Sequence, residues 1–181
     1  MKKTLIIVAH PNMEASTVHK CWVTELEKYP NHYTIHRLYQ VYPEGKIDVQ
    51  KEQNLVEAHG NLVLQFPVYW FNCPPLLKQW LDEVFTYGWG YGSQAQVLVN
   101  RKIALAVSTG IDKEGYSHNG KQKYTIEETL RPFEMTMHYV KADYQPLFVF
   151  YGIDSNEGYN PETLQRVAQS AKDYIVFLEK M

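Results

Sequence analysis

Short apolar runs recur along the chain, and polar stretches with the spacing of helices separate them. The runs at residues 4–9, 62–66 and 103–107 are almost continuously apolar and contain several β-branched residues. This pattern is typical of strands that are buried on both faces of a parallel sheet. Together with one alternating and one final apolar run, the sequence predicts five strands, at residues 4–9, 33–39, 62–66, 103–107 and 147–151.

Helix start signals lie between these strands. Ser16 can cap a helix, and Pro74 and Pro75 can begin another, since the missing N–H of proline costs nothing in the first turn. Thr125 and Glu128 have the spacing of a capping box. The predicted helices are 16–28, 48–58, 74–85, 125–138 and 160–180.

Alternating strands and helices predict an α/β fold with a parallel sheet covered on both faces. Right-handed crossovers then give a doubly wound, three-layer sandwich. Five strands favour the flavodoxin-like order 2-1-3-4-5 over that of a longer sheet. The chain has 181 residues and shows neither an internal repeat nor a linker, so a single domain over residues 1–181 is expected.

Composition excludes several functional classes. The net charge of −2 argues against a nucleic-acid partner, because such proteins need a basic surface. No apolar run approaches the ~18 residues needed to span a bilayer, and the run at residues 5–9 is too short for a secretory signal. Two cysteines, Cys21 and Cys73, argue against a disulfide scaffold or a Cys-rich metal site. We therefore expect a cytoplasmic protein without membrane insertion and without a metal, in which Cys73 is an unreactive loop residue.

In a sheet of this order, ligands bind at the carboxyl ends of the strands, which points to loops 10–17, 67–73 and 108–116. The first loop leads into a helix, whose free N–H groups suit a phosphate. His10 can add a charged or neutral donor, and Ser16 and Thr17 add hydroxyls. A plain β–α turn with a capped helix would give the same pattern. The loop lacks the glycine patterns of Rossmann dinucleotide sites and of P-loop nucleoside triphosphatases.

Aromatic residues make up 14% of the chain, and they cluster where the second loop is expected. Tyr69, Trp70 and Phe71 follow the third strand, and a second group with Tyr91 lies at residues 87–91. Aromatic side chains are more often buried in the hydrophobic core, but a cluster of them at strand ends suits a flat aromatic ligand. In the third loop, Gly110 lets backbone N–H groups approach a planar polar edge.

These residues together resemble a known family. Five motifs of this sequence carry the resemblance: Ala-His-Pro-x4-Ser at residues 9–16, Phe-Pro-Val-Tyr-Trp-Phe-x-x-Pro-x-x-Leu-Lys-x-Trp-Leu-Asp at 66–82, Gly-Trp-Gly-Tyr-Gly at 88–92, Ser-Thr-Gly at 108–110 and Leu-Arg-Pro-Phe-Glu at 130–134. Residues 66–92 are the specific part. The chain is similar to the flavodoxin-like NAD(P)H:quinone oxidoreductase (DT-diaphorase) family in its bacterial short form.

The resemblance implies a flavin site and assigns its residues. The phosphate region would lie at His10, Ser16, Thr17 and Val18; the ribityl chain and ring at Pro67, Val68, Tyr69, Trp70 and Phe71; the polar ring edge at Ser108, Thr109, Gly110, Ile111 and Tyr116. Catalytic roles would fall to Tyr116, Gly110 and His118, and the substrate pocket to Trp70, Phe71 and Tyr91, the last contributed by a second subunit. Two positions depart from the family: Ile111 replaces a second glycine, and Gln122 stands where the animal enzymes have a catalytic histidine, with His118 close by.

The implied activity is that of a flavoprotein that reduces quinones or nitroaromatics with NAD(P)H, by two-electron hydride transfer and ping-pong kinetics. FMN is expected rather than FAD, because the chain lacks the large C-terminal region of the animal enzymes. A homodimer is expected from the family. The alternative is a regulatory ancillary subunit that docks on a potassium-efflux transporter, with oxidoreductase activity secondary.

Overall fold

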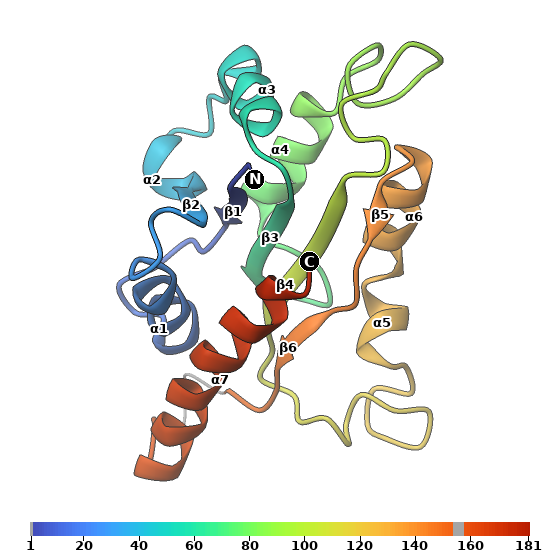
Figure 1. Cartoon of the computed structure of the whole chain (residues 1–181). Coiled ribbons are helices and arrows are strands. Elements are labelled where there is room, and N and C mark those ends of the chain that lie inside the picture. Colours follow the sequence, from blue (N-terminus) through green and yellow to red (C-terminus); the bar gives the residue numbers. More distant parts are fainter. Residues whose placement is uncertain (1, 154–157) are drawn as a thin grey trace.

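A parallel sheet forms the centre of the protein in the computed structural model, which describes residues 2–153 and 158–181 (Figure 1). Its main strands are β1 (Thr4–Val8), β2 (Tyr33–Arg37), β3 (Leu62–Pro67) and β4 (Lys102–Ser108). The strand order is β2-β1-β3-β4-β5, in which β5 is Asp143–Tyr144, and all of these pairs are parallel. The predicted flavodoxin-like order is therefore confirmed.

The fifth position of the sheet differs from the prediction, because two short strands occupy it. These are β5 (Asp143–Tyr144) and β6 (Phe148–Phe150), and both pair with β4, so that the described residues form six strands where five were predicted. Pro146 lies between them and has no N–H to donate to the neighbouring strand. The apolar run at residues 147–151 thus indicated only the second of the two strands.

Seven helices are present in the described part of the chain, and their starts follow the capping residues. They are α1 (Thr17–Leu26), α2 (Leu38–Val41), α3 (Val49–Ala58), α4 (Pro75–Val84), α5 (Ile126–Thr129), α6 (Arg131–Tyr139) and α7 (Pro161–Glu179). Ser16 caps α1, and Thr125 and Glu128 form the predicted capping box of α5. The single helix predicted over 125–138 is two helices, because Pro132 has no N–H for the carbonyl of Glu128. The strand predicted over 33–39 ends at Arg37, where α2 begins.

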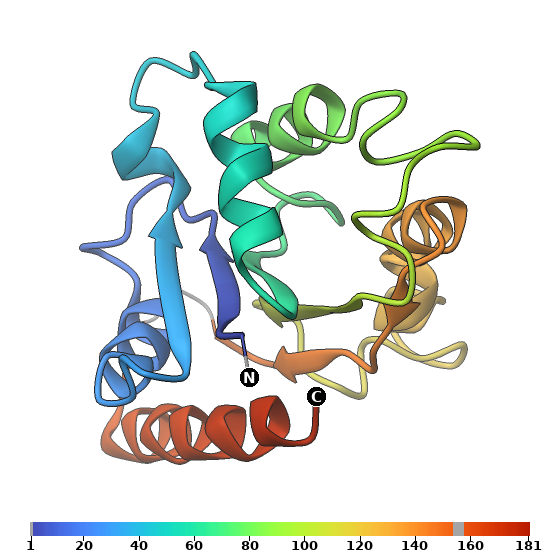
Figure 2. The ribbon, with the colours of Figure 1, turned by 45° about the horizontal axis from the view of Figure 1, so that its top comes forward.

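Helices cover both faces of the sheet, as Figure 2 shows for α1 and α7 on one face and for α3 and α4 on the other. Alternate side chains of β1 enter the two layers: Ile6 packs in the cluster that contains Trp22 of α1, and Leu5 in the cluster that contains Trp80 of α4. None of the helices in the described part of the chain is long and apolar enough to cross a membrane.

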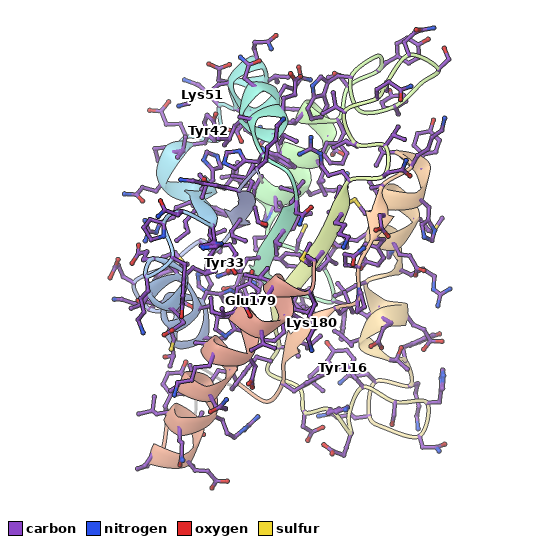
Figure 3. All side chains as sticks on the ribbon, in the orientation of Figure 1. Tyr33, Tyr42, Lys51, Tyr116, Glu179 and Lys180 are labelled. Carbon is purple, nitrogen blue, oxygen red and sulfur yellow. The ribbon has the colours of Figure 1, made fainter. Side chains whose placement is uncertain are left out.

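The register of the strands brings three loops to one edge of the sheet. Val8 pairs with Gln65 between β1 and β3, and Pro67 pairs with Ser108 between β3 and β4. The segments that follow β1, β3 and β4 therefore leave the sheet side by side. Figure 3 shows Tyr116 on the last of these segments, between β4 and α5. This edge holds the three loops that the sequence singled out.

Candidate functional site

The loop between β1 and α1 presents backbone donors and a neutral imidazole. Ser16 Oγ accepts the N–H of His19, and His10 Nδ1 accepts the N–H of Asn12 at 3.1 Å. The amides of Thr17 and Val18 lie in the first helical turn, where an α-helix offers no internal acceptor. The side chain of Val18 is buried, so only its amide can serve a ligand.

Burial sets the protonation state of His10. The ring is nearly enclosed, and this burial lowers its pKa to about 4. Of the charged and neutral donors that the sequence allowed, the structure therefore supports the neutral one near pH 7. Since Nδ1 accepts a hydrogen bond, the proton of the neutral ring sits on Nε2, which remains a donor.

The loop after β3 is a tight hairpin with two aromatic residues at its tip. Tyr69 and Asn72 exchange backbone hydrogen bonds of 2.8 and 3.0 Å. Between them, Trp70 and Phe71 have φ angles of 47° and 63°, which correspond to a type I′ turn and are unfavourable for bulky side chains. Trp70 is 93% exposed and Phe71 46%. Strain and exposure at the same two rings are typical of a ligand-binding site.

Thr109 and Gly110 form the edge of the site at the end of β4. Thr109 Oγ1 donates to the hydroxyl of Tyr116 at 3.4 Å and accepts the N–H of Ile111 at 3.3 Å. A Cβ atom added at Gly110 would meet only Ile153 O, at the ordinary distance of 3.5 Å. The packing of the protein thus leaves room for a side chain at Gly110, and this space is available to a ligand.

Residues 112–122 fold back on themselves and bury Tyr116. Asp112 accepts the N–H of Gly115 at 2.6 Å, and Gly115 O accepts the N–H of Gln122 at 3.0 Å. A Cβ at Gly120 would lie 2.2 Å from Glu114 O, so this turn requires glycine. The loop holds Tyr116 firmly against Thr109.

His118 lies elsewhere on this loop. Its side chain is exposed, and Nε2 lies 3.7 Å from Glu128 Oε2, the carboxylate that also accepts the N–H of Thr125 at the start of α5. The structure therefore brings Tyr116, Thr109 and Gly110 together but places His118 beside α5.

Tyr91 lines a surface groove. Its ring centroid is 5.8 Å from that of Tyr87 and 5.7 Å from that of Tyr139. The groove has a volume of about 350 Å³ and runs between α4 and α6 as far as Asn72, at the base of the Trp70–Phe71 hairpin. Tyr91 is thus connected to the hairpin along one surface.

A larger cavity, of about 540 Å³, lies beside His10, between the first loop, α1 and residues 37–40. Its polar rim contains the ion pairs Lys20–Glu14 and Arg37–Glu27. Of the three loops of the site, only the first borders this cavity, so the predicted flavin site does not coincide with it. Cys73 lies at the end of the β3 loop, where burial raises the pKa of its thiol to about 11, as expected for an unreactive cysteine.

Sequence reasoning missed two buried polar residues beneath the three loops. His19 Nε2 lies 2.9 Å from Ser108 Oγ, and His19 Nδ1 lies 3.3 Å from the amide nitrogen of Gln65. His19 is three residues before Trp22 and four before Val23, so the helical spacing places it on the buried face of α1. This spacing could have predicted from the sequence that His19 is buried.

Comparison with known proteins then identifies the family. A profile of the flavodoxin-like fold matches residues 2–175. The chain belongs to this flavodoxin-like family. The resemblance drawn from the motifs at residues 9–16 and 66–92 is thereby confirmed.

Several relatives in this family align with this chain over most of their own length. General stress protein 14 of Bacillus subtilis is 42% identical over 178 residues, which cover 98% of both chains. An uncharacterized NAD(P)H oxidoreductase of the same organism is 45% identical over 83% of this chain and 86% of its own. KefG of Yersinia pestis, an ancillary protein of a glutathione-regulated potassium-efflux system, is 32% identical over 98% of this chain and 93% of its own.

Solved structures of the family agree with the fold. General stress protein 14 of Treponema denticola, in complex with FMN, has a TM-score of 0.93 and 52% identity, with 98% of both chains covered. An NADPH-quinone reductase from P. pentosaceus has a TM-score of 0.81 and 31% identity, over 95% of this chain and 96% of its own.

Proposed function

We propose that this protein is an FMN-dependent NAD(P)H oxidoreductase that reduces quinones, and also nitroaromatics, with ping-pong kinetics. The observation that carries the proposal is the meeting of three loops at one sheet edge, where donors, exposed rings and an unfilled glycine lie together. The FMN complex of the relative that is 52% identical supports the cofactor. The relatives named as an NAD(P)H oxidoreductase and an NADPH-quinone reductase support the activity.

The residues fit FMN from its phosphate to its ring. In this proposal the N–H groups of Thr17 and Val18, the hydroxyl of Ser16 and Nε2 of neutral His10 hold the phosphate. The backbone of Pro67 and Val68 and the side chains of Tyr69, Trp70 and Phe71 flank the ribityl chain and the ring. Gly110 admits the ring edge, because an added Cβ there would point into space that the protein leaves free. A bound flavin supplies hydride transfer from NAD(P)H to the acceptor.

Tyr116 is the proposed proton-holding group at the ring edge. Its oxygen accepts from Thr109 Oγ1, which leaves its own proton free to be donated to the flavin edge. The N–H of Gly110 can add a second donor, whereas the N–H of Ile111 is already directed at Thr109 Oγ1. Donors fixed in this way stabilise negative charge that develops at the ring. His118, on the outer side of the same loop, is retained as a second proposed proton carrier.

We further propose a homodimer in which the groove lined by Tyr91 and Tyr139, together with Tyr87 beside it, receives a second copy of the chain. Tyr87 and Tyr139 are exposed, and such a row of rings is typical of an interface. In the dimer, Tyr91 would reach the partner's substrate pocket beside Trp70 and Phe71.

A second candidate function rests on the identity of 32% with KefG. In that case the protein docks on a potassium-efflux transporter, and its oxidoreductase activity is secondary. Both candidate functions require a bound flavin. Only the oxidoreductase function predicts rapid turnover in the absence of a transporter.

The test is to purify the protein, record its visible spectrum and identify the released flavin by chromatography. Initial rates of NADH and NADPH oxidation are then measured at several quinone concentrations. We expect FMN and parallel double-reciprocal lines, because one pocket serves both substrates in turn. Intersecting lines would reject the shared pocket. Turnover that becomes rapid only with a co-purified transporter would favour the ancillary function.

A further inference from the structure

His19 is the third residue of α1, yet its side chain is completely enclosed, with 1% exposed. Its ring packs edge-to-face against Trp22, with the centroids 5.1 Å apart, and its centroid lies 5.3 Å from that of His10. Its backbone N–H donates to Ser16 Oγ at 3.1 Å. One residue therefore links the cap of α1 with the layer of side chains beneath the sheet edge.

Two hydrogen bonds fix the ring and its tautomer. The amide nitrogen of Gln65 faces Nδ1, so Nδ1 accepts and the proton sits on Nε2. Nε2–H then donates to Ser108 Oγ at 2.9 Å. Burial lowers the pKa of His19 well below its ordinary value, in agreement with a neutral ring that is a donor on one side and an acceptor on the other.

Ser108 extends this connection to the remaining two loops. It is the last residue of β4 and precedes Thr109. Its carbonyl accepts the N–H of Val68 at 2.8 Å, at the start of the aromatic hairpin. A continuous set of hydrogen bonds thus runs from Ser16 through His19 and Ser108 to Val68, and it touches all three loops.

We propose that His19 is a positioning residue, which through its Nε2–H bond to Ser108 holds the phosphate end of the site at a fixed distance from the ring end. This inference rests on the proposed function, since it concerns the same FMN site. The ribityl chain that joins the ring to the phosphate has a limited reach, so both ends bind well only when the three loops keep their relative position. His19 itself is buried and does not contact the flavin.

The decisive variants differ in the bond that they keep. His19→Leu removes both ring contacts, and Ser108→Ala removes the acceptor alone. His19→Gln retains an amide N–H that can reach Ser108 Oγ. Val63→Ala is the control for packing, because Val63 is buried in the same layer and carries no polar group.

The measurements are FMN and riboflavin dissociation constants, the flavin absorption spectrum and the melting temperature. We expect His19→Leu and Ser108→Ala each to weaken FMN binding about tenfold. The double variant should bind FMN no more weakly than the weaker-binding of the two single variants, because both remove the same bond. His19→Gln should retain most of the wild-type affinity. Riboflavin, which lacks the phosphate, should lose less affinity than FMN. Val63→Ala should lower the melting temperature and leave FMN affinity within about twofold.

The outcomes separate the two proposals. If wild-type protein binds no FMN, the proposed function fails, and this inference fails with it. If wild-type protein binds FMN but folded His19→Leu and Ser108→Ala bind it equally well, only the role of His19 is overturned. Losses that add fully in the double variant also overturn it, since the two groups would then act separately.

Discussion

The rings of His10 and His19 lie 5.3 Å apart, centroid to centroid, at the start of α1. Burial lowers the pKa of His10 to about 4. Burial and the proximity of His10 lower the pKa of His19 well below its ordinary value. Two neutral imidazoles therefore stand behind the proposed phosphate position. His10 Nε2–H can donate a hydrogen bond there, while Nε2–H of His19 is used by Ser108, and no second positive charge lies behind the donor.

The stability of the flavin-free protein should fall as the pH is lowered from 6.5 to 5. In this window the unfolded chain binds protons at both histidines, whereas the folded chain does not, so protonation favours unfolding. We expect a loss of about 3 kcal/mol in the free energy of unfolding for the pair, because each histidine that stays neutral in the folded chain contributes up to about 2 kcal/mol over this range. Urea titrations at pH 7 and pH 5 measure it. His10→Asn should show a smaller loss; a loss equal to that of the wild type would mean that His10 does not contribute.

The aromatic hairpin should lower the stability of the folded protein and at the same time increase its affinity for FMN. Trp70 and Phe71 occupy positions of positive φ that Asn and Gly adopt at little cost. The double replacement Trp70→Asn with Phe71→Gly should therefore raise the free energy of unfolding by about 1 kcal/mol. FMN affinity should fall about tenfold, because the proposed ring contacts are lost. Thermal unfolding and FMN titration measure the two effects, and unchanged FMN affinity would exclude the hairpin from the site.

Gly110 and Gly120 should respond to alanine in different ways. Space exists for a Cβ at Gly110, so Gly110→Ala should change stability by less than about 0.5 kcal/mol and still weaken FMN binding by blocking the ring edge. Gly120→Ala should instead lower the melting temperature, because its Cβ would collide with the carbonyl of Glu114. Thermal unfolding and FMN titration distinguish the two. Normal FMN affinity in Gly110→Ala would contradict the proposed ring position.

Tyr116→Phe tests the proton-holding hydroxyl. The ring remains in place, so stability should change little. Loss of the hydroxyl donor should lower kcat about tenfold while KM for NAD(P)H stays within about twofold. Steady-state rates with a quinone acceptor provide the measurement. Thr109→Val, which removes the group that donates to Tyr116, serves as the comparison and should give a smaller effect in the same direction.

Local signals explain how much of the fold could be predicted from sequence. The caps at Ser16 and Asn160 and the box of Thr125 and Glu128 depend on residues within one turn, and each begins a helix where expected. The buried runs of β1, β3 and β4 were equally clear. Two of the errors occur at prolines: Pro132 divides a helix and Pro146 divides a strand, because each removes one N–H from an otherwise regular pattern. The third error is the end of the strand predicted over 33–39, where α2 begins after Arg37.

The site was less accessible to sequence reasoning because it depends on contacts between distant residues. Ser108 and His19 are 89 residues apart, and no spacing rule joins them. The strained turn at Trp70 and Phe71 could not be foreseen either, since Asn and Gly, not aromatic residues, are typical of it. Position in the strand order, by contrast, was sufficient to predict that the three loops meet at one edge of the sheet.

Titration of the flavin-free protein with FMN, followed by flavin fluorescence, tests the central claim most directly. We predict saturable binding of one FMN per chain, with riboflavin bound at least about tenfold more weakly because the phosphate contacts at His10 and the start of α1 are missing. Flavin fluorescence that rises in proportion to the added FMN, as it does without protein, would contradict an FMN site at this edge of the sheet.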